Sequence, residues 1–538
     1  SITKVLSATP VATVQSLHVI DLISQHYACN PWDLIRSAIP PRVASVDKSI
    51  QGVIVDSSKS SKRTIEFQTL APFNQAHNQV VQLVQENQGT GSILIVAPDE
   101  KDVDLIIGAL TKFGLSSVKL TAAMPREERY RNYLEAMRRP ISIVVGTRSA
   151  IFAPVINLTT VIIHKESSLD HYEVRSPGWN TRTVALIRSE VESFKLVLTG
   201  FSPSIEVSQL IDEREIKYLN AKESVTVKAF TPSEGALLPG RIFTDVKKAL
   251  ITGPVLFIAP RKGYGNALLC AHCRNVAACE CGGRLSVSAK GKAPSCVHCG
   301  YSFPAWKCTF CNRDKQYLAG RGIERAAEEI SRAFPNFPVV ISAGEVIKDR
   351  IEAKPALVLA TPGAQPQVEG GYAAVVILEG LRFFAHTDLR TQERARELFL
   401  ETSSLISPEG SVLLVIDDSH PIVSAIARWN IAPLLKRELS ERLELKLPPS
   451  VFSVVLVMDQ AISMQIANGL KKAAAEGRIP PSSCIYGPTE ISKGQVKIVI
   501  HADKKDASAL TDSMHELQRR RSIAKKELFT LRVEPYSL

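Results

Sequence analysis

The sequence contains no uncharged apolar run of roughly 18 residues, the length that a membrane-spanning helix needs. Its first 30 residues also lack the charged start, apolar centre and small-residue cleavage site of a signal peptide. We therefore expect a cytoplasmic protein with no membrane partner. The hydrophobic content of 45% and the charged content of 22% over 538 residues are ordinary for folded globular domains.

A second absence is the phosphate-binding loop G-x-x-x-x-G-K-[ST], which holds ATP through backbone N–H groups and a lysine. The only Gly-Lys pair, Gly291-Lys292, is followed by Ala293. Such a loop would belong before the apolar run at 92–97, where the sequence is "TLAPFNQAHNQ" instead. The pattern thus predicts no conventional ATP site.

Cysteine is scarce outside one short segment, which holds eight of the ten in the chain. The eight form four pairs: Cys270 and Cys273, Cys279 and Cys281, Cys296 and Cys299, and Cys308 and Cys311. In a reducing cytosol such clusters favour metal binding over disulfides. A C-x-x-C turn aims two sulfurs at a point about 2.3 Å from each, so two turns complete a Cys₄ zinc site. We expect two zinc ions; an iron–sulfur cluster and core or redox cysteines are the alternatives.

Fourteen residues separate the two inner pairs, which is long enough for an antiparallel ribbon. This spacing predicts a nested arrangement in which the outer two pairs share one ion and the inner two pairs share the other. The Cys279–Cys281 pair is one residue shorter than the other three.

The cysteine segment is also basic. Between Arg261 and Arg321 there are ten Lys or Arg residues and two acids, a balance of +8 in a chain of +11. Interleaved aromatics suit stacking on unpaired bases, although small zinc modules also use aromatics as their only core. Part of the charge would also neutralise the thiolates. Candidate DNA contacts here are Arg261, Lys262, Tyr264, Arg274, Trp306 and Lys307.

A second basic run, "QRRRSIAKKE" at 518–527, is predicted to lie on a helix. Arg521 and Lys525 would then share one face, because residues four apart are neighbours on a helix. We add both to the candidate DNA contacts, with a solvated surface as the alternative.

Elsewhere, short apolar runs alternate with polar helical stretches, which is typical of α/β domains with parallel sheets. One series covers 92–97, 141–145, 159–163 and 195–199, and a second covers 254–258, 338–341, 356–360, 373–378 and 411–416. The residues from about 446 predict a small α+β domain. The expected domains are 1–50, a remnant of an N-terminal DNA-binding domain; 51–64, a linker; 65–230 and 231–259 with 320–445, two motor domains; 260–319, the zinc module; and 446–538, the C-terminal domain.

The cysteine module, preceded by "APRKGYGNALLC" and followed by "GRGIERAAEEISRAFP", resembles that of the replication-restart helicase family PriA, or primosomal protein N′. Weaker similarities follow in the same order along the chain, at 25–43, 144–154, 175–185, 389–399 and 531–535. The resemblance implies two RecA-like helicase domains, the nested zinc sites, single-stranded or forked DNA as ligand, and primosome and single-strand-binding proteins as partners.

The departures from this family concern ATP hydrolysis. Its acidic D-E-x-H motif is replaced by "IIHKESS", in which only Glu166 is acidic, and its G-R-A-G-R sequence by "TSSLISPEG" at 402–410, which has no arginine. An arginine finger alone contributes about 10³–10⁵ in rate. We therefore expect degenerate motor domains that do not hydrolyse ATP, as in a branch of the family without helicase motifs. The alternatives are an active ATP-dependent 3′-to-5′ helicase with unrecognised catalytic residues and a zinc-ribbon adaptor of another nucleic-acid complex.

Overall fold

The computed structural model describes residues 10–50, 62–139, 141–232, 236–260, 268–287, 292–297, 299–318, 323–386, 388–492 and 494–538. The chain divides into two compact units. The first comprises Ser1–Thr69, Ala76–Leu219 and Leu435–Leu538, and the second Leu70–Gln75 and Asn220–Leu434. Among the described helices, none has the length and apolar character that crossing a membrane requires.

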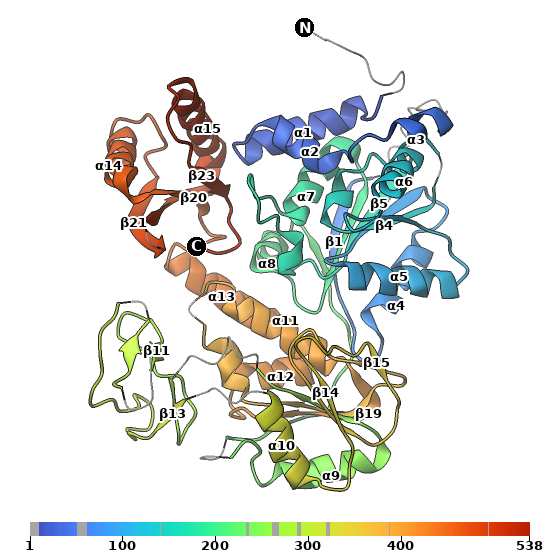
Figure 1. The fold of residues 1–538 in the computed structure, drawn as a ribbon, viewed down its shortest axis with the longest axis vertical. Helices are drawn as coiled ribbons and strands as arrows, with labels where there is room; N and C mark the ends of the chain where they lie inside the picture. Colours follow the sequence, from blue (N-terminus) through green and yellow to red (C-terminus); the bar gives the residue numbers. More distant parts are fainter. Residues whose placement is uncertain are drawn as a thin grey trace. The chain divides into compact units, whose positions relative to one another are not determined.

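The first unit contains a seven-stranded parallel sheet in the order β3-β4-β2-β5-β6-β1-β7 (Figure 1). Its strands are β1 (Thr64–Thr69), β2 (Ser92–Val96), β3 (Val118–Leu120), β4 (Ile143–Gly146), β5 (Leu158–Ile163), β6 (Lys195–Gly200) and β7 (Lys217–Leu219). The helices between them are α4 (Ala76–Glu86), α5 (Glu100–Lys112), α6 (Arg126–Arg138), α7 (Thr181–Glu192) and α8 (Ile205–Asp212).

Both faces of this sheet are buried, which explains why its central strands are apolar throughout. Along β2, Ile93 and Ile95 pack into a core with α4 and α5. The alternate residues Leu94 and Val96 pack into a core on the opposite face, which includes α6 and α7. Because successive strand residues point to opposite faces, one short apolar run serves both cores.

The first unit also contains both ends of the described chain. The N-terminal helices α1 (Val14–His26), α2 (Pro31–Ala38) and α3 (Ala44–Ser49) share the larger core of the sheet. So does a C-terminal α+β domain, whose antiparallel sheet has the order β21-β22-β20-β23. Its elements are β20 (Phe452–Asp459), α14 (Gln460–Ala475), β21 (Cys484–Ser492), β22 (Gln495–Ala502), α15 (Ala507–Ile523) and β23 (Thr530–Val533).

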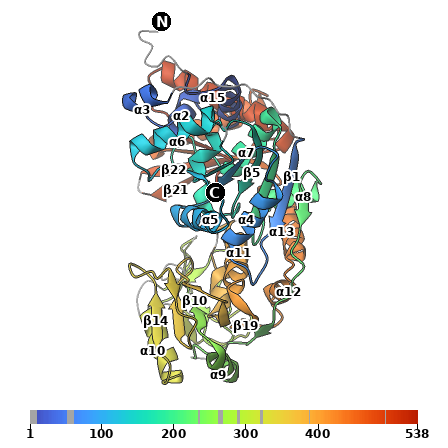
Figure 2. The same cartoon turned by 90° about the vertical axis from the view of Figure 1, so that its right-hand side faces the viewer.

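The second unit contains a six-stranded parallel sheet in the order β14-β16-β9-β18-β19-β8. Its strands are β8 (Val227–Ala229), β9 (Val255–Ile258), β14 (Val339–Ser342), β16 (Leu357–Ala360), β18 (Tyr372–Ile377) and β19 (Ile406–Leu414). α9 (Ile242–Thr252) and α10 (Ile323–Ala333) share one core with this sheet, and Figure 2 shows α10 beside β14. α11 (Thr391–Ser403) packs against β18, and α12 (Pro421–Ala427) follows β19.

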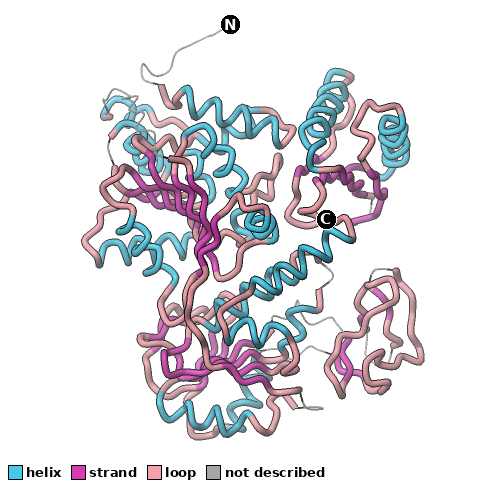
Figure 3. Tube along the Cα trace, turned by 180° about the vertical axis from the view of Figure 1, so that it is seen from behind, coloured by secondary structure: helices cyan, strands magenta, loops and turns pink. Residues whose placement is uncertain are grey.

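The cysteine module is inserted between β9 and α10. It consists of two small antiparallel ribbons, β10 (Leu268–Cys270) with β13 (Gln316–Leu318) and β11 (Leu285–Ser286) with β12 (Ser295–Cys296). The α/β class, the two parallel sheets, the inserted module and the C-terminal α+β sheet agree with the prediction from the sequence, and Figure 3 shows the sheets in magenta with helices around them.

Candidate functional site

The four cysteine turns have one backbone design. In each, the residue directly after the second cysteine has a positive φ, namely Arg274 (60°), Gly282 (80°), Gly300 (75°) and Asn312 (57°). The N–H of that residue donates to the carbonyl of the first cysteine over 2.9–3.0 Å. The left-handed residue reverses the chain and turns both sulfurs of a pair towards the same side. The shorter Cys279–Cys281 turn follows the same rule, because Gly282 closes it.

The eight sulfurs form two separate groups. Cys270 Sγ lies 3.4 Å from Cys311 Sγ, and Cys273 Sγ lies 3.5 Å from Cys308 Sγ. In the second group the corresponding distances are 3.7 Å for Cys279 with Cys299 and 3.5 Å for Cys281 with Cys296. Within each group all four sulfurs lie within 4.8 Å of one another. The structure therefore groups the sulfurs as the nested arrangement predicts.

These distances fit a tetrahedral Cys₄ metal site. Four sulfurs at about 2.3 Å from one zinc ion would lie about 3.8 Å apart, whereas disulfide sulfurs lie about 2.05 Å apart. N–H groups also point at the sulfurs: the His272 amide lies 3.4 Å from Cys270 Sγ, and the Asn275 side chain 3.5 Å from Cys273 Sγ. Such donors stabilise thiolate charge, so each group can hold a divalent metal ion.

Two of the expected DNA contacts, Trp306 and Arg274, are largely buried inside the module. Trp306 is 7% exposed and packs in the core of the module with Leu268 and Leu285. Arg274 is also 7% exposed, and its guanidinium carbon lies 3.6 Å from the centre of the Tyr317 ring. Their burial has a physical reason, because a module this small uses its large side chains as its core; their contact with DNA stays a prediction. Lys307 is exposed, whereas Arg261, Lys262 and Tyr264 lie outside the described residues.

The expectation for the tail helix is wrong in its geometry. α15 ends at Ile523, and Lys525 follows it with a φ of 52°, so Arg521 and Lys525 do not share a helix face. Arg521 Nε donates to the Glu527 carbonyl over 2.7 Å, and its guanidinium carbon lies 4.2 Å from the centre of the Phe529 ring. Arg521 therefore stabilises the segment that connects α15 to β23.

The segment Leu70–Gln75 joins β1 to α4, the place where a phosphate-binding loop would lie, and it groups with the second unit. Trp429 Nε1 donates to the Leu70 carbonyl over 2.8 Å in a buried contact. The N–H of Phe73, which has a φ of 63°, donates to the Ser404 carbonyl over 3.3 Å. The Phe73 N–H therefore makes a hydrogen bond within the chain and is not available to a phosphate.

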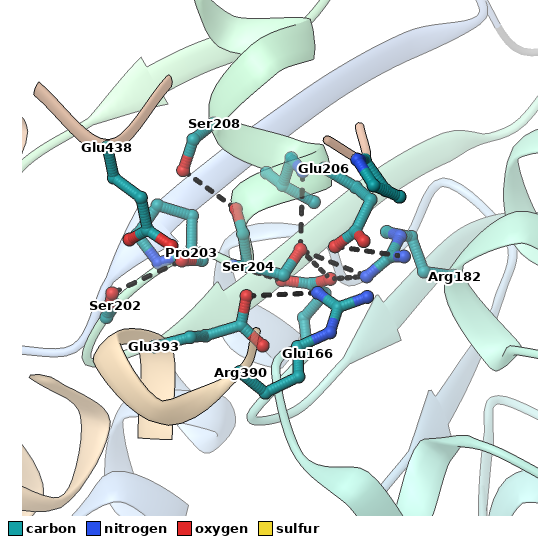
Figure 4. Close-up of polar contacts among 12 residues, drawn as sticks. Glu166, Arg182, Ser202, Pro203, Ser204, Glu206, Ser208, Arg390, Glu393 and Glu438 are labelled. Carbon is teal, nitrogen blue, oxygen red and sulfur yellow. Dashed lines mark hydrogen bonds and ion pairs between the residues drawn. The ribbon is translucent and has the colours of Figure 1, made fainter. Parts of the chain in front are cut away.

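Glu166, which the resemblance places in the family's acidic ATPase motif, is held in a buried network (Figure 4). Glu166 is 1% exposed and follows β5. Its Oε1 accepts from Arg182 Nη1 over 2.5 Å and from the Ser204 hydroxyl over 2.7 Å, and its Oε2 accepts from the Ser204 amide over 3.1 Å. Arg182 also pairs with Glu206 at 3.5 Å. Glu166 thus has a structural role that binds α7 and α8 to the sheet.

The residues beside Glu166 are also buried or paired. His164 is fully buried, and burial lowers its pKa to about 3, so the ring is neutral. Its Nδ1 contacts the Thr199 hydroxyl at 3.2 Å. Lys165 pairs with Asp102 at 3.3 Å. Although burial opposes ionisation of Asp102, the charge of Lys165 keeps the pKa of this carboxyl low. The "HKES" segment therefore places no second free carboxylate beside Glu166.

The segment at 402–410, where the resemblance places the family's arginine-bearing motif, also differs from that motif. Residues 402–410 run from the end of α11 into β19 and include no arginine. Thr402 and Ser403 are fully buried there. The segment therefore offers a transferred phosphate no positive charge.

The contact that holds the cysteine module to the second sheet could not be predicted from the sequence. The Tyr317 hydroxyl donates to Glu379 Oε1 over 2.8 Å, and Arg382 Nη1 donates to Glu379 Oε2 over 2.5 Å. Arg382 is 1% exposed, and Glu379 has a φ of 47°. A left-handed backbone is unusual for a glutamate, so Glu379 is distinguished by its conformation and not by a pattern in the sequence.

Comparison with curated proteins finds several replication restart proteins among the relatives of this chain. A probable replication restart protein PriA of Mycobacterium tuberculosis is 30% identical over 500 residues, which cover 84% of this chain and 76% of the relative. The corresponding protein of Mycobacterium leprae is 29% identical over 91% of this chain and 82% of the relative. The replication restart protein PriA of Bacillus subtilis is 21% identical over 79% of this chain and 58% of the relative.

Among solved structures, RecG bound to a three-way DNA junction matches 79% of this chain and 52% of its own, with a TM-score of 0.38 and 12% identity. The Escherichia coli DExH-box NTPase HrpB matches 72% of this chain and 44% of its own, with a TM-score of 0.37 and 12% identity. No model of a protein family matches the sequence.

Proposed function

Because the chain belongs to the PriA family of replication restart proteins, we propose that it binds DNA during replication restart and does not hydrolyse ATP. The buried Glu166–Arg182 pair is the observation that carries this proposal. A carboxylate that assists hydrolysis must reach a metal ion or the attacking water. Both oxygens of Glu166 are instead occupied by Arg182 and Ser204.

Three further observations support the proposal that the chain does not hydrolyse ATP. No phosphate-binding loop precedes α4, the Phe73 N–H binds the Ser404 carbonyl, and residues 402–410 have no arginine. Phosphate positioning, metal binding and charge neutralisation of the transition state are therefore all weakened together. An active ATP-dependent 3′-to-5′ helicase remains the alternative function, and it would need catalytic groups elsewhere.

We assign DNA binding to the cysteine module, with zinc in both Cys₄ groups: Cys270, Cys273, Cys308 and Cys311 on one ion, and Cys279, Cys281, Cys296 and Cys299 on the other. The exposed aromatics Tyr301 and Phe310 and the exposed Lys307 are the contacts that suit unpaired bases and phosphates. Single-stranded or forked DNA is the expected ligand, and primosome and single-strand-binding proteins are the expected partners. The alternative function, a zinc-ribbon adaptor of another nucleic-acid complex, would use the same cysteine module but would bind different protein partners.

Phosphate release by the purified chain with single-stranded DNA tests the proposal, with a Glu166→Gln variant as background control. We expect no DNA-stimulated release from either protein and no strand separation. Electrophoretic retardation of single-stranded or forked DNA should persist until a strong chelator removes zinc, because structural zinc contributes roughly 10–16 kcal/mol to the folding of small modules. ATP turnover above the Glu166→Gln background would show that the chain is an active ATPase. Pull-down of restart proteins by this chain would distinguish the proposed function from the zinc-ribbon adaptor, which would have other partners.

A further inference from the structure

A pocket of about 750 Å³ lies within the second unit, where the cysteine module meets the carboxyl ends of β18 and β19. The module contributes His272, Cys273 and Asn275 to its lining. The sheet contributes Leu381, Asp417, His420 and Pro421 from the turns that follow the two strands. Ligands commonly bind at this end of a parallel sheet, and the volume is in the usual range of small-molecule pockets, roughly 300–1,000 Å³.

The charge of the described lining disfavours a phosphate. No lysine or arginine is among the described residues that line it, and Asp417 contributes a negative charge. The Ser419 hydroxyl and amide both donate to Asp417 Oδ1, over 2.6 and 3.0 Å, and these bonds lower the pKa of Asp417. The carboxylate is therefore ionised and fixed, and Oδ2 takes part in neither contact.

His420 supplies a hydrogen-bond donor, Nε2–H, to the same pocket as the Asp417 carboxylate. Its Nδ1 accepts the Ile422 amide over 3.3 Å at the start of α12. Burial lowers the pKa of His420, so the ring is neutral and its proton is on Nε2. The ring lies against Phe384, with centroids 4.8 Å apart, which keeps its orientation.

Asn275 adds a second acceptor from the module. Its Nδ2 is directed to Cys273 Sγ at 3.5 Å, which leaves Oδ1 to accept. Leu381 and Pro421 add apolar wall to the same pocket. The lining thus offers the His420 N–H, the oxygens of Asp417 and Asn275, the polar side chains of His272 and Thr231, and apolar surface.

We propose that this pocket binds a single unpaired nucleobase through its hydrogen-bonding edge, an inference that rests on the proposed DNA binding. A flat heteroaromatic ring with amino and carbonyl or ring-nitrogen groups satisfies the donor and the acceptors together, and its faces suit the apolar wall. A cationic side chain would be satisfied by Asp417 but would oppose the His420 N–H. The phosphates of the same strand would lie outside the pocket.

Binding of the zinc-loaded full chain to a single-stranded oligonucleotide and to an abasic strand of equal length tests this inference. Asp417→Asn keeps the shape of the side chain but removes its charge, and His420→Asn keeps an N-cap for α12 but removes the ring donor. Each should lower the preference for the base-bearing strand by about 5- to 10-fold, the effect of one hydrogen bond of roughly 1–1.4 kcal/mol. The control Glu352→Gln, an exposed carboxylate that pairs only with Lys354 over 2.6 Å, should leave the preference unchanged.

Saturation-transfer NMR with free adenosine and cytidine provides a measurement that does not depend on DNA binding. We expect transfer to both nucleosides that Asp417→Asn weakens. If the chain binds no DNA but shows this transfer, the proposed function is wrong and the pocket assignment stands. If the variants bind base-bearing DNA like the unaltered chain, or if arginine rather than a nucleoside shows the transfer, the pocket assignment is wrong while DNA binding stands.

Discussion

Glu166 and Arg182 form a buried ion pair in which the guanidinium Nη1 lies 2.5 Å from the carboxylate, and the side chains are 0% and 10% exposed. The pair joins the end of β5 to α7 and, through the Ser204 hydroxyl, to the start of α8. A residue whose place in the sequence suggests ATP chemistry thus stabilises the fold of the first unit.

We predict that Arg182→Met destabilises the chain by about 3–5 kcal/mol, because it leaves the Glu166 carboxylate buried without its charged partner. Adding Glu166→Gln to that variant should restore a large part of the loss. Urea unfolding followed by circular dichroism measures both effects. Arg437→Met, which breaks an exposed pair with Glu441, serves as the control and should cost under about 1 kcal/mol. Equal losses for the two arginine variants would contradict a structural role for the buried pair.

The nested metal sites predict which paired cysteine changes remove one ion and which remove two. The double variant Cys270→Ser with Cys311→Ser alters one group, so about one zinc per chain should remain. The double variant Cys270→Ser with Cys279→Ser alters both groups and should leave none. Elemental analysis by mass spectrometry after dialysis counts the metal. A sequential arrangement, in which the first two pairs share an ion, would give the opposite result.

Buried His164 predicts a loss of stability in acid. Its pKa is about 3 in the folded chain, below the usual value near 6.5, so the unfolded chain binds a proton more readily. Its stabilising contribution is complete above pH 6.5 and is lost as the pH falls towards 3. At pH 5 the loss is about 2 kcal/mol. His164→Gln should flatten the pH dependence of the unfolding free energy between pH 7 and 5, and an unchanged dependence would contradict the prediction.

We expect changes at Arg521 and Lys525 to have different effects, one on stability and the other on DNA binding. Lys525→Ala should flatten the slope of log K against log salt for single-stranded DNA by about 0.7, the effect of one phosphate contact. Arg521→Ala should leave this slope unchanged and lower the melting temperature, because Arg521 holds Glu527 and packs on Phe529. A flatter slope for Arg521→Ala alone would show that Arg521 contacts DNA.

The cysteine module could be predicted from the sequence because its information is local. Two cysteines within three or four residues must point their sulfurs to one side, and the residue after each pair closes the turn. The strand series was predictable for a similar reason, since strands buried on both faces must be apolar. Strands β1 and β21 did not appear in the predicted series because polar residues interrupt their sequences.

The sequence by itself determined the α/β class, the two series of parallel strands, the pairing of eight cysteines that can hold metal, and the absence of a phosphate-binding loop. Only the tertiary structure decided that residues 435–538 group with the first unit, that Trp306 and Arg274 are buried, and that Glu166 has Arg182 and Ser204 as partners. These depend on side chains that meet after the chain has folded, 16 and 38 residues apart in the case of Glu166. Periodicity and spacing record which residues are neighbours along the chain, whereas burial and charge pairing follow from which surfaces the folded chain brings together.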